Sequence, residues 1–126
     1  MIIKHILAHS HISKVKEGDL YRAYKLFFNT FASEQRLKIL NLLRKREMNV
    51  SEIQKATGFE QSVVSHNLKR LKSCGFITQE PKGKYRYYTL NENTIKPMLT
   101  LIDGHMKEHC LLIVRGFKGG KNAGKT

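Results

Sequence analysis

The hydrophobic pattern predicts a short amphipathic helix over residues 60–75. Val64, Leu68 and Leu71 recur at intervals of four and three, so they form an apolar stripe along one side of a helix. The opposite side is polar and increasingly positive, and it carries Gln61, Ser62, Ser65, His66, Lys69 and Lys72. A helix fits the major groove of DNA, where its N-terminal side chains contact bases and its cations contact phosphates. We therefore interpret this segment as a recognition helix.

Any surface helix has one apolar and one polar side, so the flanking segments decide this interpretation. Residues 50–58 predict a second short helix, with Ser51 and Gln54 spaced as a capping box and Gly58 at the end. Gly75 ends the recognition helix, and FITQE and YRYYTL then predict two strands joined by the turn PKGK. The predicted fold is mainly α with a small β-hairpin wing, a winged helix-turn-helix.

Four segments in this order and spacing resemble the winged helix-turn-helix repressors of the ArsR type: FASEQRLKILNLL, VSEIQKATG, QSVVSHNLKRLKSCGFI and KGKYRYYTL. The resemblance covers about residues 19–113 of the chain. Its most specific part is QSVVSHNLKRL followed by Gly75. The resemblance implies a dimeric, DNA-binding transcriptional regulator.

Two further amphipathic helices flank this predicted DNA-binding unit. Asp19 can cap the first, in which Leu20, Ala23, Tyr24, Phe27, Phe28 and Phe31 form an aromatic face. Asn93 can cap the second, with Pro97 in its first turn. In the resembled family the first helix packs against the last helix of the other subunit, whereas the alternative for any single Phe is its own chain's core. The residues expected at a dimer surface are Leu20, Tyr24, Phe27, Phe28, Ile95, Leu99, Ile102, Met106 and Ile113.

The remaining segments predict scaffold and termini. Ser33 can cap a largely buried helix containing Leu37, Ile39, Leu40, Leu42 and Leu43. Arg44, Lys45 and Arg46 suit the end of that helix through its dipole, so we assign them no site. The chain is long enough for one domain, and we divide it into an N-terminal extension (1–18), the winged domain with its flanking helices (19–113) and a mobile, basic Gly/Lys-rich tail (114–126).

The charge balance favours a polyanionic partner. The chain has 23 Lys and Arg against 10 Asp and Glu, a net charge of +13. Double-stranded DNA is the expected partner, with phosphate contacts from the wing and base or phosphate contacts from the helix. The expected DNA-binding residues are Gln61, Ser62, Ser65, His66, Lys69, Arg70, Lys82, Lys84 and Arg86. Tyr87 is expected to pack within the wing strands.

Cysteine content and hydropathy indicate the compartment. Cys74 and Cys110 are too few and too far apart to predict a disulfide framework or a four-thiolate zinc site. No apolar run approaches the ~20 residues that span a bilayer, and residues 1–7 lack the features of a signal peptide. We expect a cytoplasmic, nucleoid-associated protein without a membrane partner.

The C-terminal tail contains a match to the phosphate-loop pattern, formed by Gly119, Gly124, Lys125 and Thr126. That loop presents backbone N–H groups and a helix N-terminus to phosphate, and no helix follows here. We interpret the match as accidental. No carboxylate and imidazole groups cluster in sequence for acid–base chemistry either, so we expect no enzymatic activity.

Metal sensing is an open alternative, because some members of the resembled family bind metal through cysteines in the helix before the recognition helix. VSEIQKATG contains no Cys, His or Asp, so that site is absent. Other members use an Asp-x-His pair and a second His pair in the last helix, and Asp103 and His105 reproduce only the first half. His105 and His109, four residues apart, are candidate metal ligands, and the alternative is two polar residues at the edge of a dimer seam.

The sequence therefore predicts a sequence-specific transcriptional regulator, a repressor acting as a homodimer on a palindromic operator. The alternatives are a sequence-tolerant chromatin-type DNA-binding protein and a metal-responsive repressor that uses histidines of the last helix. No firm cofactor is expected. The operator, the regulated genes and any small-molecule or ion effector are outside what the sequence determines.

Overall fold

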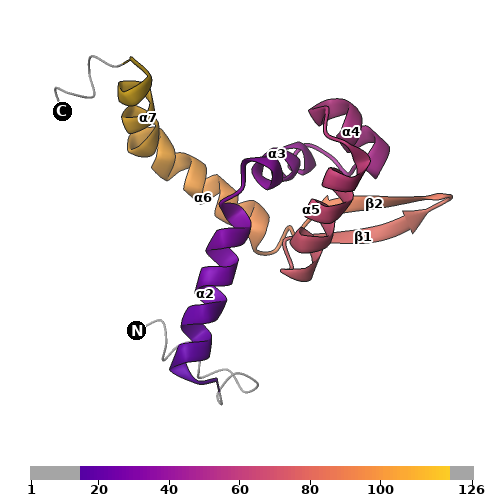
Figure 1. Ribbon diagram of the computed structural model, residues 1–126, viewed down its shortest axis with the longest axis horizontal. Helices are drawn as coiled ribbons and strands as arrows, with labels where there is room; N and C mark the ends of the chain where they lie inside the picture. Colours follow the sequence, from indigo (N-terminus) through magenta and orange to yellow (C-terminus); the bar gives the residue numbers. More distant parts are fainter. Residues whose placement is uncertain (1–14, 120–126) are drawn as a thin grey trace.

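Helices form where apolar residues recur at helical spacing, and one β-hairpin forms where that spacing changes. The computed structural model describes residues 15–119. Their order is α2 (Glu17–Phe31), α3 (Glu34–Leu43), α4 (Val50–Thr57), α5 (Gln61–Ser73), β1 (Ile77–Lys82), β2 (Tyr85–Leu90), α6 (Ile95–Glu108) and α7 (Cys110–Gly119). Helices α3, α4 and α5 and the hairpin form one body, from which α2 and the α6–α7 pair extend in different directions (Figure 1). The predicted winged helix-turn-helix is confirmed.

The core lies where α3, α4, α5 and the base of the hairpin meet. Phe76, just before β1, is fully buried, and its ring centroid lies 5.2 Å from that of Phe27 and 4.7 Å from that of Phe31. These aromatic contacts attach α2 to the body, because edge-on and tilted rings add to the free energy gained by burial. The core side chains are Ile39, Leu40, Leu43, Met48, Ile53, Val64, Leu68, Leu71, Phe76, Ile77, Leu90, Ile95 and Leu99.

Helix α4 has recognisable signals at both ends, and α5 has one at its end. Asn49 caps α4: its side chain accepts a hydrogen bond from the Glu52 backbone, and the Glu52 side chain accepts one from the Asn49 backbone. The capping box is therefore Asn49–Glu52, and the predicted Ser51–Gln54 box is wrong, because Ser51 already lies inside the helix. Gly58 ends α4 with a φ of 79° and Gly75 follows α5 with a φ of 77°, as predicted.

Helices α2 and α3 agree only in part with the sequence predictions. Ser33 caps α3, as predicted, by accepting a hydrogen bond from the Arg36 backbone. Leu37, predicted to be buried, is 43% exposed. Helix α2 begins at Glu17, two residues before Asp19, so Asp19 contributes to the first turn rather than capping it. Residues 17 and 18 thus belong to a helix, while residues 1–14 of the predicted extension lie outside the described part.

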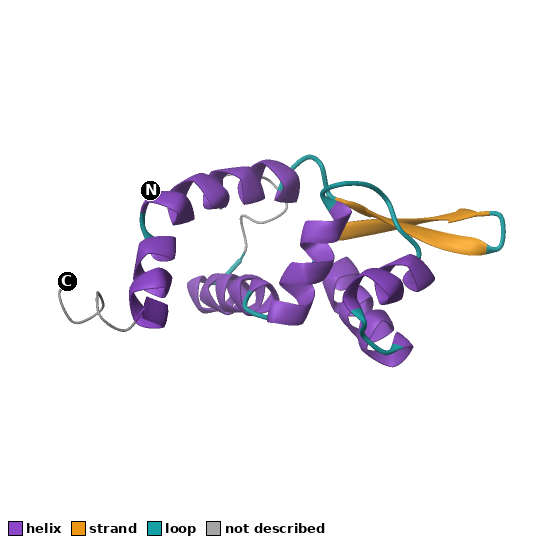
Figure 2. Ribbon diagram, turned by 90° about the horizontal axis from the view of Figure 1, so that it is seen from above, coloured by secondary structure: helices purple, strands orange, loops and turns teal. Residues whose placement is uncertain are grey.

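The wing is an antiparallel hairpin that projects from one end of the molecule (Figure 2). Ile77 pairs with Leu90, and both are buried at its base. Gly83, the first of two turn residues, has a φ of 65°, which glycine adopts at little cost in tight hairpin turns. Pro81, predicted to lie in the turn, lies within strand β1 opposite Arg86.

The last helix is interrupted, in contrast to the single continuous helix expected. Asn91, rather than Asn93, provides the side-chain acceptor before α6, for the backbone N–H groups of Asn93 and Thr94. His109 has non-helical dihedral angles (φ −124°, ψ −72°) and separates α6 from α7. Helix α7 continues to Gly119, so residues 114–119 are helical and do not form the predicted tail. Most of the phosphate-loop match lies outside the described residues.

Candidate nucleic-acid interface

Helix α5 presents a polar surface on one side and buries the other. Val64, Leu68 and Leu71 are almost completely buried against the core. The side chains predicted to contact DNA at its start and middle are exposed, namely Gln61, Ser62, Ser65, His66 and Lys69. Donors and acceptors are therefore concentrated at the N-terminal end of an exposed helical face.

Asn67 is a buried polar residue of α5 that the sequence analysis missed. Its amide nitrogen donates to Gln35 Oε1 (3.2 Å) and to the Val63 carbonyl (2.9 Å), and its oxygen accepts from Arg36 Nη1 (3.2 Å). The amide is thus fully used, and in residues 15–119 no buried side-chain nitrogen or oxygen lacks a partner. The signal was present, because position 67 falls on the apolar stripe beside Val64 and Leu68.

Thr30, at the end of α2, connects three helices. Its buried hydroxyl donates to the Leu26 carbonyl (2.8 Å) and accepts from Arg70 Nε (3.2 Å), and it lies 3.4 Å from Cys74 Sγ. Arg36 Nε on α3 donates to the Thr30 carbonyl (2.8 Å), and burial, followed by the nearby charge of Arg70, lowers the pKa of the Arg36 guanidinium. Arg70 therefore faces α2, which corrects its predicted place on the DNA-facing surface.

The three predicted wing cations differ in their surroundings. Lys82 Nζ lies 2.6 Å from Glu47 Oε2, and this hydrogen bond raises the pKa of Lys82. It also lies over the Tyr87 ring, 5.8 Å from the centroid, which agrees with the predicted strand packing of Tyr87. Lys84 and Arg86 are exposed and form no ion pair with any residue that the structure describes. The charge of Lys82 is thus partly neutralised within the chain.

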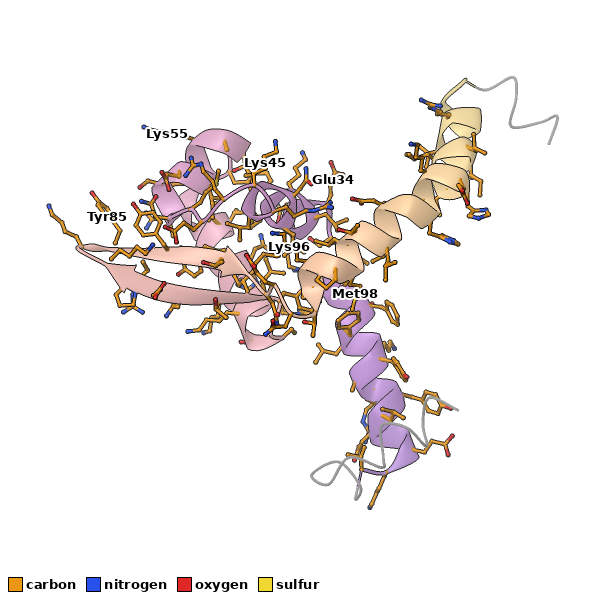
Figure 3. The ribbon with its side chains drawn as sticks, turned by 180° about the vertical axis from the view of Figure 1, so that it is seen from behind. Glu34, Lys45, Lys55, Tyr85, Lys96 and Met98 are labelled. Carbon is orange, nitrogen blue, oxygen red and sulfur yellow. The ribbon has the colours of Figure 1, made fainter. Side chains whose placement is uncertain are left out.

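A polar hollow of about 370 Å³ lies between the wing and the helix-turn-helix. Tyr85, one of its residues, lies near the end of the hairpin (Figure 3). The hollow joins the start of α4, the start of α5 and strand β2 into one surface, so side chains missed by the sequence analysis, such as Ser51 and Gln54, belong to the same face. Its lining residues are Asn49, Val50, Ser51, Gln54, Gln61, Lys84, Tyr85, Arg86 and Tyr88.

An apolar groove of about 520 Å³ lies on the opposite part of the molecule, between α2, α3 and α6. Met98 lies where α6 meets α2 (Figure 3). The groove is lined mainly by Phe27, Phe28, Phe31, Leu37, Leu40, Met98, Leu99, Ile102 and Met106. An open apolar surface of this kind indicates a partner.

Burial within one chain refines the predicted dimer surface. Leu20, Ile95 and Leu99 are each at most 8% exposed, so their own chain already covers most of their surface, and their assignment to a subunit interface stays a prediction. Phe28 and Ile113 are 60% and 57% exposed, and Tyr24, Phe27, Ile102 and Met106 are partly buried. The structure adds exposed apolar residues that were not predicted, namely Tyr21, Leu26, Leu101, Leu111, Leu112 and Val114.

Comparison with known proteins places this geometry in a family. The sequence profile of the bacterial regulatory protein, arsR family, matches residues 33–79. The arsenical resistance operon repressor of Bacillus subtilis is 31% identical over 85 residues, which are 67% of this chain and 81% of that protein. The chain belongs to the arsR family of bacterial regulatory proteins. In this arsR-family chain the profile match spans α3, α4, α5 and the beginning of β1.

Two further proteins resemble this arsR-family chain over a similar length. The transcriptional repressor SdpR of Bacillus subtilis is 31% identical over 80 residues, which are 60% of this chain and 89% of that protein. The solved homodimeric winged helix-turn-helix DNA-binding domain of a possible ArsR-family transcriptional regulator from Mycobacterium bovis has a TM-score of 0.70 and 28% identity. That match covers 77% of this chain and 90% of the solved one.

The histidines considered as metal ligands lie at the end of α6 in this arsR-family chain. The rings of His105 and His109 are 4.5 Å apart between centroids, and both side chains are exposed. Asp103 is held by Arg44, whose Nη2 lies 2.7 Å from its carboxylate. Between residues 15 and 119 no three His, Cys, Asp or Glu side chains gather closely enough to hold a metal ion. The described residues of one chain therefore provide the two imidazoles of His105 and His109, which are too few ligands to complete a zinc site.

Between residues 15 and 119 each helix is too short or too polar to span a lipid bilayer.

Proposed function

We propose that this protein is a homodimeric transcriptional repressor that binds a palindromic operator, with one α5 helix in each of two major grooves. The observation that carries the proposal is the exposed N-terminal end of α5, where Gln61, Ser62, Ser65 and His66 present short donors and acceptors beside a cationic wing. Base edges in the major groove require such groups, whereas phosphates require cations. The arrangement supports specific base contacts from α5 and backbone contacts from the wing.

The relatives support the regulatory role. The Bacillus subtilis proteins are repressors by name, and the Mycobacterium bovis domain is described as DNA-binding. All of them match the part of this chain that contains the helix-turn-helix. We extend to this chain the class of partner, double-stranded DNA, and the direction of regulation, repression.

The proposed dimer uses the apolar groove and the exposed side chains near it. Phe28 on α2 and Ile102 and Met106 on α6 border the groove, and a second subunit would cover them. The Mycobacterium bovis domain is homodimeric. Two-fold symmetry would place the two recognition helices about one helical turn of DNA apart, roughly 34–36 Å between centres.

A sequence-tolerant chromatin-type protein is the second candidate, because the net charge of +13 favours any duplex. The two candidates differ in what the N-terminal side chains of α5 do. If they contact bases, removing one contact costs specific binding ~1–3 kcal/mol and leaves binding to random duplex nearly unchanged. If the protein is sequence-tolerant, both kinds of duplex are affected alike.

The test starts with selection of bound duplexes from a random pool, which yields an operator. Gln61→Ala and Ser65→Ala are then titrated against this operator, a version with five base pairs inserted between half-sites, and a random duplex, at one salt concentration. Ser73→Ala is the matched control, because Ser73 is exposed at the opposite end of the same helix.

We expect Gln61→Ala and Ser65→Ala to weaken operator binding by roughly 5- to 150-fold per subunit, the equivalent of one lost base contact in each half-site, and Ser73→Ala to have little effect. The insertion should abolish simultaneous docking, since it rotates the second half-site by about half a turn. A promoter carrying the operator should be transcribed less in the presence of the protein. Equal losses on all duplexes, or indifference to the insertion, would favour the chromatin-type protein.

A further inference from the structure

We propose that Gln79 is a positioning residue that joins Lys72 of the recognition helix and Arg86 of the wing into one dicationic site for a DNA backbone phosphate. In the amide orientation that satisfies its neighbours, Gln79 Oε1 accepts from Lys72 Nζ (3.0 Å) and from Arg86 Nη1 (2.9 Å). The amide nitrogen donates to the Tyr88 hydroxyl at 3.2 Å. One neutral side chain thus fixes two cations from different elements.

The sheet register explains how these groups meet. Gln79 pairs with Tyr88 and Pro81 pairs with Arg86, so the side chains of Gln79, Tyr88 and Arg86 lie on one face of the hairpin. This is also the face of Ile77 and Leu90, which are buried at the base of the hairpin. The amide therefore links wing and recognition helix at the face by which the hairpin joins the body.

The neutrality of Gln79 is what leaves the site available to an anion. No carboxylate offsets the charges of Lys72 and Arg86, because their shared acceptor is a neutral amide and neither forms an ion pair in residues 15–119. Lys82, on the other side of the hairpin turn, shows the opposite arrangement, since its acceptor is the Glu47 carboxylate. A phosphate oxygen is the anion that fits two adjacent, exposed cations on a DNA-facing surface.

The inference rests on the proposed function, because it assigns a phosphate contact of the same interface. It adds Gln79 to the residues that determine DNA binding and assigns Lys72, a cation of the recognition helix, a defined partner in the wing. Arg86 also lines the polar hollow beside α4 and α5, so the site is continuous with the surface that carries Gln61.

The test compares two substitutions that add the same negative charge at neighbouring positions. Gln79→Glu keeps the size of the side chain and both contacts but adds one negative charge between the two cations, whereas Thr78→Glu places the charge at an exposed position on the other face of the strand. Binding of each full-length variant to the selected operator and to random duplex is measured over a range of salt concentrations, and thermal unfolding is followed in parallel.

We expect Gln79→Glu to make the log–log salt dependence of binding shallower by about 0.9 per subunit, the value of one lost phosphate contact, on both duplexes. Thr78→Glu should change the slope by less than half of that. Lys72→Gln, which leaves Gln79 in place, should act like Gln79→Glu, and the two together should have less than the summed effect, because they remove the same contact.

Several outcomes would overturn the inference. If Gln79 only fastens the hairpin, Gln79→Glu will bind with an unchanged slope, because its carboxylate preserves both contacts. Equal effects of Thr78→Glu and Gln79→Glu, or full additivity with Lys72→Gln, would show that no shared phosphate site exists. Failure of the proposed function is recognised separately, by a wild-type protein that does not distinguish the operator from random duplex or binds neither.

Discussion

The buried amide of Asn67 shows how single side chains fix the recognition helix. Its hydrogen bonds reach Gln35 and Arg36 on α3, so the polar group stabilises one orientation of α5 relative to the scaffold. Removing one of these three side chains would destabilise the fold, because the buried polar groups of the other two would then lack a hydrogen-bond partner. The orientation of the helix therefore depends on a residue that does not lie on its exposed face.

We expect Asn67→Ala to lower the free energy of unfolding by about 1–3 kcal/mol, because it leaves the Arg36 and Gln35 groups without their partner. Urea denaturation at one protein concentration measures the change. Ser65→Ala, at an exposed position of the same helix, should remain within about 0.5 kcal/mol of wild type. Similar losses for both variants would contradict a structural role of Asn67.

Residue-level prediction from sequence succeeded for one side of α5 and failed for part of the other. The helical period separated Gln61, Ser65 and His66 from the apolar stripe. The same period puts position 67 on the apolar stripe, but it did not reveal the partners of Asn67 and Arg70, because Gln35 and Thr30 lie more than 30 residues away along the chain. Periodicity states which face a side chain occupies, but not whether a polar group there finds a distant partner.

At the scale of elements, the start of α4 depends on Asn49. We expect Asn49→Ala to cost about 1 kcal/mol of unfolding free energy through loss of the cap. Ser51→Ala is the control, since Ser51 lies inside the helix and is exposed. Chemical denaturation of the two variants decides between the observed and the sequence-predicted capping residue, and a larger loss for Ser51→Ala would show that the cap is misplaced.

The same cap makes stability depend on pH. The Asn49 backbone N–H lowers the pKa of Glu52 below its ordinary value of 4.5, and Arg46 adds to this. A carboxyl group with a depressed pKa in the folded state stabilises the fold above 4.5, and this contribution disappears as the pH falls through the folded-state pKa. The difference in unfolding free energy between wild type and Glu52→Gln should therefore shrink below pH 4.5. A difference that stays constant across that range would exclude this role of Glu52.

Within the wing, an intramolecular ion pair distinguishes two lysines that look equivalent in the sequence. We expect Lys84→Gln to reduce the log–log salt slope of DNA binding by about 0.9 per subunit, and Lys82→Gln to reduce it less, because Glu47 already balances Lys82. Titrations of both variants over a range of salt concentrations measure the slopes. A larger change for Lys82→Gln would mean that its pair with Glu47 opens on DNA.

Element existence was predictable from sequence, whereas interruptions were not. Gly58, Gly75 and Gly83 are recognisable in the sequence as the ends of helices or as a turn, because glycine readily adopts the positive φ angles that these positions have. The break at His109 has no comparable signal, because the apolar pattern continues through α7. The wrong capping residues have a similar cause, since Ser51 and Asn49 are both good caps and only the backbone shows where the helix begins.

At the scale of the whole molecule, the apolar groove determines assembly. We expect Ile102→Asp to dissociate the proposed dimer, because an unpaired carboxylate buried at a subunit interface costs several kcal/mol. Thr100→Asp is the matched control: Thr100 is exposed and lies on a different side of α6. Sedimentation velocity measures both. A dimeric Ile102→Asp variant would place the interface elsewhere.

The hydrogen bonds around Thr30 bear on how the protein could acquire new target sites. Arg70 joins α5 to Thr30 of α2, and Arg36 of α3 donates both to the Thr30 carbonyl and to Asn67 of α5, so a shift of the recognition helix alone would break these contacts. In the proposed dimer, the separation of half-sites is then determined where α2 and α6 meet the other subunit, while the preferred bases are determined by Gln61 and its neighbours. Adaptation to an operator with a different spacer requires substitutions far from DNA, whereas adaptation to different half-site bases requires substitutions only at the start of α5.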